Sequence, residues 1–282
     1  MIDFIAEVSS NHGRDLERCF AFIDRAGEIG CTAVKFQLFR VRALFAPEAL
    51  AADPAKLARE DWELPVDFLA PLAERCRARG LRFAATPFYL EAVEELRPHV
   101  DFYKIASYEL LWDGLLAACA ATGKPVMLSC GMASLDEVRH AVAVIRDAGG
   151  AQFTLLHCVS GYPAPPEACN LAAIETLRAA TGCPVGWSDH SANPGVLARA
   201  IHRWGAQVIE FHLDLDARGA EYAAGHCWLP EEIGAAIADA TAGWAADGDG
   251  IKRPTAAERA ECDWRADPAD GLRPLRKIRR SL

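Results

Sequence analysis

Two histidines stand at the ends of short segments that have the composition of buried strands. His190 closes the segment W-S-D-H and His212 closes I-E-F-H. In a chain of alternating strands and helices, these positions lie at the carboxyl ends of consecutive strands. Two imidazoles there can bind a divalent metal over the mouth of a sheet or barrel and leave coordination positions open for a substrate. Histidines at strand ends also occur as hydrogen-bonded core residues, so the spacing alone leaves both interpretations open.

Two lysines lie inside apolar segments, Lys35 in A-V-K-F-Q and Lys104 in F-Y-K-I. A buried ammonium group costs free energy unless an anion compensates it, and that anion is either a carboxylate such as Glu7 or a bound substrate. Small hydroxyl residues end other strand segments and would complete a cradle for phosphate and carboxylate groups: Thr86, Ser107, Ser129 and Ser188. The pattern predicts a small anionic substrate.

Two further carboxylates have alternative interpretations. Glu109, two residues after Ser107, is a candidate general base, but a glutamate at the beginning of a helix is also a favourable partner of the helix dipole. Asp189 either holds His190 in its orientation or caps the next helix.

The elements that must position these residues are eight strands that alternate with amphipathic helices. We expect strands at Asp3–Val8, Ala33–Gln37, Arg82–Thr86, Phe102–Ala106, Val126–Ser129, Phe153–Cys158, Val185–Ser188 and Gln207–His212. Eight units without a G-x-G-x-x-G motif favour an α/β fold with a single (β/α)8 TIM barrel, whose active site lies at the carboxyl ends of the strands, over a doubly wound sheet. Residues 38–65 exceed an ordinary loop and should form a lid or wall over the mouth.

Composition limits the partners and the compartment. A formal net charge of −9 disfavours nucleic acid and anionic membranes as partners and favours small molecules. No segment has transmembrane length and the N-terminus lacks a basic region, so we expect a cytoplasmic protein. Its ten cysteines, which form no C-x-x-C pair, should be reduced and mostly buried. We expect the barrel in residues 1–245 and a basic C-terminal extension in residues 246–282.

Taken together and in this order, the motifs resemble those of N-acetylneuraminate (sialic acid) synthases and the related pseudaminic and legionaminic acid synthases. The resemblance runs through A-E-V-S-S-N-H-G, V-K-F-Q, A-T-P-F, Y-K-I-A-S-Y-E, L-L-H-C-V-S-G-Y-P-A-P, P-V-G-W-S-D-H and V-I-E-F-H. It implies a (β/α)8 transferase that condenses phosphoenolpyruvate with an N-acetylmannosamine-like amino sugar. The products would be a 2-keto sugar acid and phosphate, and the cofactor Mn²⁺ or Mg²⁺.

The resemblance also implies a role for each matching residue. His190 and His212 would bind the metal, Glu109 would activate water, and Glu7 and Tyr162 would face the sugar. The implied catalytic residues are Lys104, Glu109, His190 and His212, and the implied substrate-binding residues are Glu7, Lys35, Gln37, Thr86, Ser107, Ser129, Ser160, Tyr162 and Ser188. We also expect a homodimer.

Three departures from the family pattern concern the acceptor sugar. Phe211 stands where the family often has lysine, and A-R-G-A-E-Y-A-A-G-H-C-W, which contains His226 out of register, replaces a G-P-D-H type loop. The sequence ends where the family's antifreeze-like domain, which donates an arginine, would begin. Two alternatives therefore stay open: a non-catalytic barrel that binds phosphoenolpyruvate or a sugar, and a metal-dependent aldolase or lyase for another small keto acid.

The departures also bear on the basic C-terminal extension. Its arginines and lysine beyond Gly271 are either part of a solvated tail or linker, or supply a cation to the site of the same barrel or a neighbour's.

Overall fold

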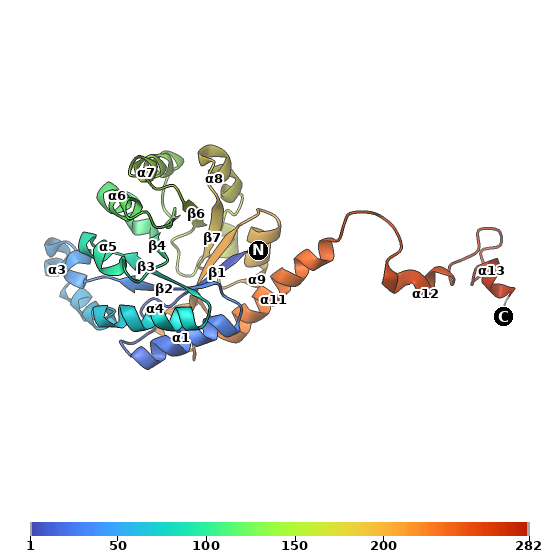
Figure 1. Ribbon diagram of the computed structural model, residues 1–282, viewed down its shortest axis with the longest axis horizontal. Coiled ribbons are helices and arrows are strands. Elements are labelled where there is room, and N and C mark those ends of the chain that lie inside the picture. The colour runs from blue at the N-terminus through green and yellow to red at the C-terminus, as the bar shows by residue number, and fades with distance from the viewer. Residues whose placement is uncertain (1, 281–282) are drawn as a thin grey trace. The chain divides into compact units, whose positions relative to one another are not determined.

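The computed structural model describes residues 2–280, which form two compact units, one ending at Thr241 and the other beginning at Ala242. In the first unit, helices surround a closed barrel of eight parallel strands, because β1 pairs with β8 as well as with β2 (Figure 1). The predicted TIM barrel is confirmed. The strands are β1 (Asp3–Glu7), β2 (Ala33–Leu38), β3 (Arg82–Pro87), β4 (Phe102–Ile105), β5 (Val126–Ser129), β6 (Phe153–Cys158), β7 (Val185–Asp189) and β8 (Val208–Leu213), with a short β9 (Cys227–Trp228) beside β8.

Helices connect consecutive strands and cover the outside of the barrel. α1 begins at a cap made by Asp15, whose side chain accepts from two backbone N–H groups, and its apolar face buries Cys19, Phe22, Ile23 and Ala26. The other helices of the first unit are α2 (Val41–Leu44), α3 (Pro47–Ala52), α4 (Leu69–Ala78), α5 (Leu90–Leu96), α6 (Asp113–Ala121), α7 (Leu135–Asp147), α8 (Ala173–Thr181), α9 (Pro194–His202) and α10 (Ala220–Ala224), besides α1 (Leu16–Glu28) and α11 (Pro230–Asp247), which continues beyond residue 241.

The inward-pointing side chains of the barrel form two layers, because every second residue of a strand points inward. The lower layer is an apolar cluster made by Ile5, Ala33, Ala84, Phe102, Met127, Leu156 and Val208. Two residues further along the same strands, side chains on the same face form an upper layer: Glu7, Lys35, Thr86, Lys104, Ser129, Cys158 and Glu210. On the carboxyl-end side of the apolar layer, the strands therefore point polar and charged groups into the barrel.

β7 contributes Gly186 to the lower layer and Ser188 to the upper one. A Cβ at Gly186 would come closer than 3.0 Å to Leu156 and to Val208, so the neighbouring side chains fill the space that a residue on β7 would need. Glycine at this position lets the layer close around larger neighbours.

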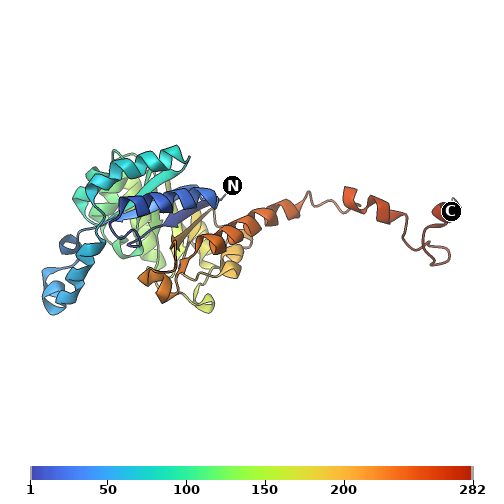
Figure 2. The same cartoon turned by 90° about the horizontal axis from the view of Figure 1, so that it is seen from below.

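Two other parts of the first unit lie at its carboxyl-end face. Residues 38–65, which we call the wall segment, fold into α2, α3 and a 3-10 helix, η1 (Pro54–Trp62). Figure 2 shows its blue helices on the same side of the barrel as the short orange helix α10. Arg14, in the loop after β1, holds the wall segment by donating to the carbonyl of Glu60 at 3.0 Å. Within the segment, Glu63 accepts from the backbone N–H of Val41 at 2.7 Å.

The second unit contains the short helices α12 (Arg259–Cys262) and α13 (Arg276–Arg279). Its basic residues pair locally: Arg276 and Arg279 contact Asp270, and Lys277 contacts Asp263. The predicted delivery of a cation from this unit to the active site stays a prediction, as does the predicted boundary after residue 245.

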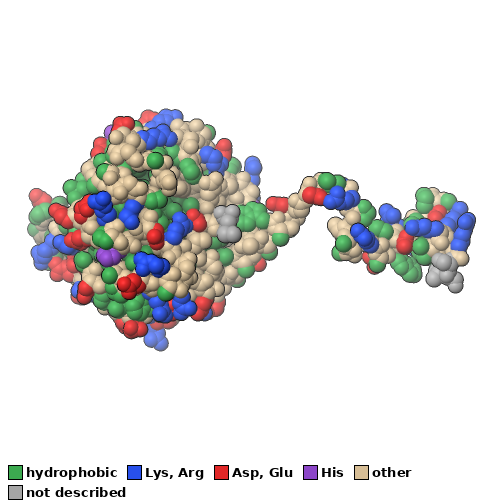
Figure 3. Space-filling view, in the orientation of Figure 1, with side chains coloured by type: hydrophobic (Ala, Val, Ile, Leu, Met, Phe, Trp, Pro, Cys, Tyr) green, Lys and Arg blue, Asp and Glu red, His purple; other side chains and the backbone are tan. Residues whose placement is uncertain are grey.

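Charges of both signs are mixed on the surface of the barrel unit. On the face seen in Figure 3, basic and acidic side chains alternate over this unit instead of forming one extended field. Among residues 2–280, none of the helices is long and apolar enough to cross a membrane. The cysteines are free and all are buried except Cys262, which is partly exposed, as the sequence predicted.

We expect Gly186→Ala to lower the free energy of unfolding by roughly 1–3 kcal/mol, because the added methyl overpacks the lower layer. Gly27→Ala is the matched control. Gly27 lies in α1, and a Cβ there would meet the side chain of Leu81 at 3.6 Å, an ordinary van der Waals contact. Replacing this helical glycine should raise the free energy of unfolding by roughly 0.5–1 kcal/mol. Urea unfolding followed by circular dichroism measures both. Equal stability of the Gly186→Ala variant and the parent would contradict this account of the barrel layers.

Candidate active site at the barrel mouth

A cavity of about 670 Å³ opens at the carboxyl ends of the strands. Its floor is the upper layer of the barrel together with the loops that follow the strands, and one side is built from the wall segment: Phe39, Leu44, Phe45, Arg59 and Trp62. The wall segment therefore borders the mouth, as predicted. A cavity of this size suits a small-molecule ligand, since such sites measure roughly 300–1,000 Å³.

Most of the site residues predicted from the sequence line this one cavity. They are Lys35, Gln37, Lys104, Ser107, Glu109, Ser129, Tyr162, Ser188, His190 and His212. Glu7 and Thr86 lie behind Lys35, and Ser160 lies beside Ser107: a Cβ at Gly131 would come closer than 3.0 Å to both serine hydroxyls. The structure brings the predicted residues together, and their individual roles stay predictions.

Both strand lysines are buried and each meets a carboxylate. Lys35 Nζ lies 2.9 Å from Glu7 and 3.6 Å from Glu210, and Lys104 Nζ lies 3.4 Å from Glu210. Burial alone lowers the pKa of Lys35, but the carboxylates of Glu210 and Glu7 outweigh it and the pKa is raised. For Lys104 burial dominates and the pKa is lowered.

Glu109 is a buried carboxyl that titrates in the neutral range. Burial raises its pKa to about 7, against the opposing field of Lys104. It ends a single 3-10 turn, η3 (Ser107–Glu109), and lies four residues before α6 begins at Asp113, so it is not in the first turn of that α-helix. Glu109 lines the cavity, and its buried Oε2 has no hydrogen-bond partner within residues 2–280, which suits a group that exchanges a proton with a ligand.

His190 and His212 lie close together, with one nitrogen of each ring already engaged. The Nδ1 of His190 lies 2.7 Å from the carbonyl oxygen of Val159, and the Nδ1 of His212 lies 2.8 Å from Glu221. These contacts leave both Nε2 atoms for another partner. The ring centroids are 5.4 Å apart, and imidazoles that bind one metal at about 2.1 Å in a near-tetrahedral arrangement have centroids roughly 5 Å apart. The pair therefore fits a metal.

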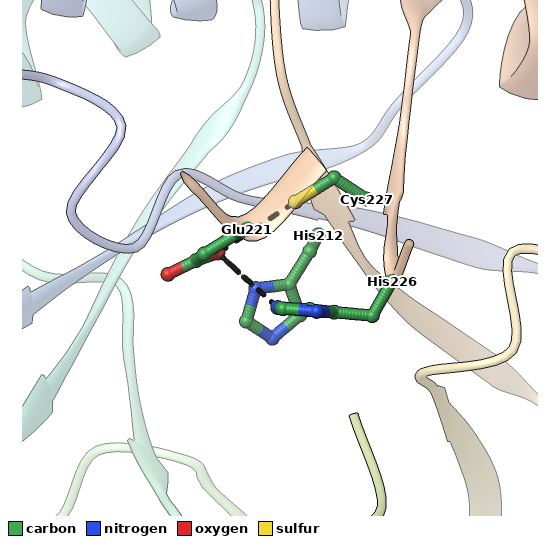
Figure 4. A group of neighbouring side chains, drawn as sticks. All are labelled: His212, Glu221, His226 and Cys227. Carbon is green, nitrogen blue, oxygen red and sulfur yellow. Dashed lines mark hydrogen bonds and ion pairs between the residues drawn. The ribbon is translucent and has the colours of Figure 1, made fainter. Parts of the chain in front are cut away.

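A third imidazole extends this group. His212, Glu221, His226 and Cys227 offer ligand atoms that all lie within 4.8 Å of one another (Figure 4). The His226 ring centroid is 5.2 Å from that of His212, and the buried Nδ1 of His226 has no hydrogen-bond partner in the part of the chain that the structure describes. Burial raises the pKa of the Cys227 thiol, which disfavours the thiolate that a metal needs. The group is a possible metal site in which nitrogen is the better donor.

Asp189 does not contact the His190 ring, but it accepts hydrogen bonds from the backbone N–H groups of Ser191 and Ala192, both at 3.2 Å, in the turn that follows His190. Its carboxylate accepts hydrogen bonds from the indole N–H groups of Trp187 and Trp228 at 3.0 and 2.9 Å. His190 is oriented by the carbonyl of Val159, and α9 is capped by Asn193. Asp189 therefore joins β7 to β9 underneath the histidines.

Of the charged residues that line the cavity, Glu221 and Arg59 were missed from the sequence, and Glu210 was given no specific role. Glu210 precedes His212 by two residues on β8, so the strand period already places both side chains on one face. Glu221 and Arg59 come from the loop after β8 and from the wall segment, where no regular period predicts the direction of a side chain.

Comparison with known proteins identifies the family. The model of the NeuB family matches residues 22–252. The chain belongs to the NeuB family. It is 32% identical over 270 residues to an N,N'-diacetyllegionaminic acid synthase of Campylobacter jejuni, covering 90% of this chain and 80% of that protein. The resemblance seen in the sequence motifs is thereby confirmed.

Two further relatives show how far the similarity extends. The spore coat polysaccharide biosynthesis protein SpsE of Bacillus subtilis is 35% identical over 221 residues, which are 75% of this chain and 59% of SpsE. A solved N-acetylneuraminic acid synthetase of Leptospira borgpetersenii superposes with a TM-score of 0.80 at 31% identity, covering 92% of this chain and 90% of that one. This chain thus spans less than two thirds of the length of SpsE.

The raised pKa of Glu109 is directly measurable. Infrared difference spectra between the parent and Glu109→Gln should show one carboxyl that loses its proton with a midpoint near pH 7, because burial disfavours its ionised form. Lys104→Met should move the midpoint to higher pH, since the ammonium group stabilises the carboxylate. A carboxylate already fully ionised at pH 5 would contradict the assignment.

Proposed function

We propose that this NeuB-family barrel condenses phosphoenolpyruvate with an N-acetylmannosamine-like amino sugar and releases a 2-keto sugar acid and phosphate. The observation that carries the proposal is a set of buried polar atoms around the cavity that have no hydrogen-bond partner among the described residues: Glu109 Oε2, Ser129 Oγ, Ser160 Oγ, Glu210 Oε2 and His226 Nδ1. Buried polar groups are almost always hydrogen-bonded, so their concentration here points to a polar ligand. The named synthases among the relatives support the same chemistry.

Phosphoenolpyruvate would lie on the floor. Its phosphate and carboxylate need several donors, and the floor offers the ammonium groups of Lys35 and Lys104 together with the hydroxyls of Ser107, Ser129, Ser160 and Ser188. Thr86 and Glu7 hold Lys35 in place, since Lys35 Nζ donates to Thr86 at 3.2 Å. Gln37 and Tyr162 border the space left for the sugar.

A divalent metal would be held through the Nε2 atoms of His190 and His212, with His226 as a third nitrogen donor. When bound, such an ion acts as a Lewis acid toward the aldehyde oxygen of the acceptor. A set of imidazoles favours Mn²⁺ over Mg²⁺, because Mg²⁺ prefers oxygen ligands. Burial and the neighbouring His212 lower the pKa of His190 to about 3, which keeps this imidazole neutral and available at pH 7.

Glu109 would move the proton in the second half of the reaction. A bond forms between C3 of phosphoenolpyruvate and the aldehyde carbon, which leaves positive charge at C2. Water then adds to C2 while the Glu109 carboxylate takes its proton, and loss of phosphate from the tetrahedral adduct gives the 2-keto acid. Lys104, which lines the same cavity, would stabilise the charge on the departing phosphate.

The two alternative functions differ from this proposal in what they release. A non-catalytic barrel would bind phosphoenolpyruvate or a sugar without product, and a metal-dependent aldolase or lyase would act on a keto acid without phosphate. The homodimer and the cytoplasmic location stay predictions, as do small molecules as the partners.

Phosphate release measured with phosphoenolpyruvate, Mn²⁺ and a panel of N-acetylated hexosamines tests the proposal. We expect phosphate to appear only when an acceptor sugar is present, and Glu109→Gln to lower turnover by roughly a hundredfold or more through loss of the general base. Absence of phosphate with every acceptor would favour the binding barrel.

The metal site has its own test. We expect His190→Ala and His212→Ala each to abolish turnover and to weaken Mn²⁺ binding, measured by electron paramagnetic resonance, because each removes a nitrogen donor. Cys227→Ser is the matched control in the same group and should bind Mn²⁺ as the parent does, since a protonated thiol is a poor ligand. Full Mn²⁺ binding by both histidine variants would rule out this site.

A further inference from the structure

The cations on the floor of the cavity are already compensated by carboxylates. Lys35 is paired with Glu7 and Glu210, and Lys104 with Glu210. Glu221 adds another, partly buried carboxylate to the lining. The floor therefore has little net positive charge left for a second anionic group beyond phosphoenolpyruvate.

Arg59 is the remaining cation of the lining and lies on the wall segment. Its guanidinium carbon lies 5.6 Å from the ring centroid of Phe45 and 5.3 Å from that of Trp62. Within residues 2–280 no carboxylate lies within ion-pair distance of Arg59; the nearby Asp53 pairs with Lys56 instead. Arg59 is exposed, so its N–H groups remain available to a ligand.

The neighbours of Arg59 restrict the position of its guanidinium group. Two aromatic rings hold the guanidinium by cation–π contacts, which reduces the freedom of a long side chain. The adjacent Glu60 anchors the segment on both sides, because its carbonyl accepts from Arg14 and its carboxylate lies 3.0 Å from Arg42. A planar guanidinium fixed in this way is suited to a bidentate contact with a phosphate or carboxylate.

We propose that Arg59 forms a subsite for an anionic group, a phosphate or a carboxylate, at the end of the acceptor sugar that lies away from its aldehyde. The proposal rests on the proposed function, in which the aldehyde end lies at His190 and His212 and phosphoenolpyruvate occupies the floor. The wall, with Arg59 between apolar rings, is the part of the cavity that neither role uses. An acceptor that spans the cavity from the histidines to the wall would present its far end to Arg59.

The test compares N-acetylmannosamine with its 6-phosphate as acceptors for the parent and for Arg59→Met, which keeps an apolar chain between the rings. We expect the parent to prefer the 6-phosphate, and Arg59→Met to raise the KM for the 6-phosphate by roughly tenfold or more, as loss of a charged hydrogen bond predicts. That increase should exceed any change in the KM for phosphoenolpyruvate. Arg42→Met is the matched control: it lies in the same segment, pairs with Glu60 and does not line the cavity.

Three results would overturn the subsite. They are equal KM values for the 6-phosphate in the parent and in Arg59→Met, a parent that does not prefer the charged acceptor, and an increase confined to the KM for phosphoenolpyruvate. If the parent releases phosphate with neither acceptor, the proposed function fails, and calorimetric binding of N-acetylmannosamine 6-phosphate tests the subsite separately. Weaker binding by Arg59→Met would then support it, and equal binding would overturn it.

Discussion

Charged side chains inside the barrel set the main constraint on this protein. Lys35, Lys104, Glu7 and Glu210 are all buried and lie within ion-pair distance of one another in a chain of contacts. Taking four charges out of water is costly, and mutual attraction offsets the cost only if each group keeps its partner. The barrel can hold them because the strand period places them in one layer, directly above an apolar layer that excludes water from below.

That layer also determines how the site around it works. Its paired charges make a fixed polar floor. Next to this floor, burial raises the pKa of Glu109 to about 7 against the field of Lys104, so this carboxyl can take or give a proton at neutral pH. The loops and the wall segment then add what a strand cannot supply: His226 and Glu221 beside the histidines, and Arg59 between two aromatic rings. In the proposed function, the strands would provide the condensation chemistry and the loops would select the acceptor.

The sequence predicted the strand-borne part of this arrangement well. Alternation along the strands placed Lys35, Lys104 and His212 near their observed positions, because a two-residue period fixes which face a side chain occupies. The role of Asp189 was not predicted. Its partners Trp187 and Trp228 come together only when β9 joins the sheet. Arg59 and Glu221 were missed for the same reason: their neighbours are set by loop packing between distant parts of the chain.

In the proposed reaction, water activated by Glu109 attacks C2 of phosphoenolpyruvate on the floor of this cavity. The most direct measurement follows the oxygen that bridges C2 and phosphorus, labelled with ¹⁸O. If water adds to C2 and the adduct loses phosphate, the C–O bond breaks and the label leaves with inorganic phosphate, where it shifts the ³¹P resonance. Release of unlabelled phosphate, with the label retained in the sugar acid, would mean that water attacks phosphorus and would contradict the account.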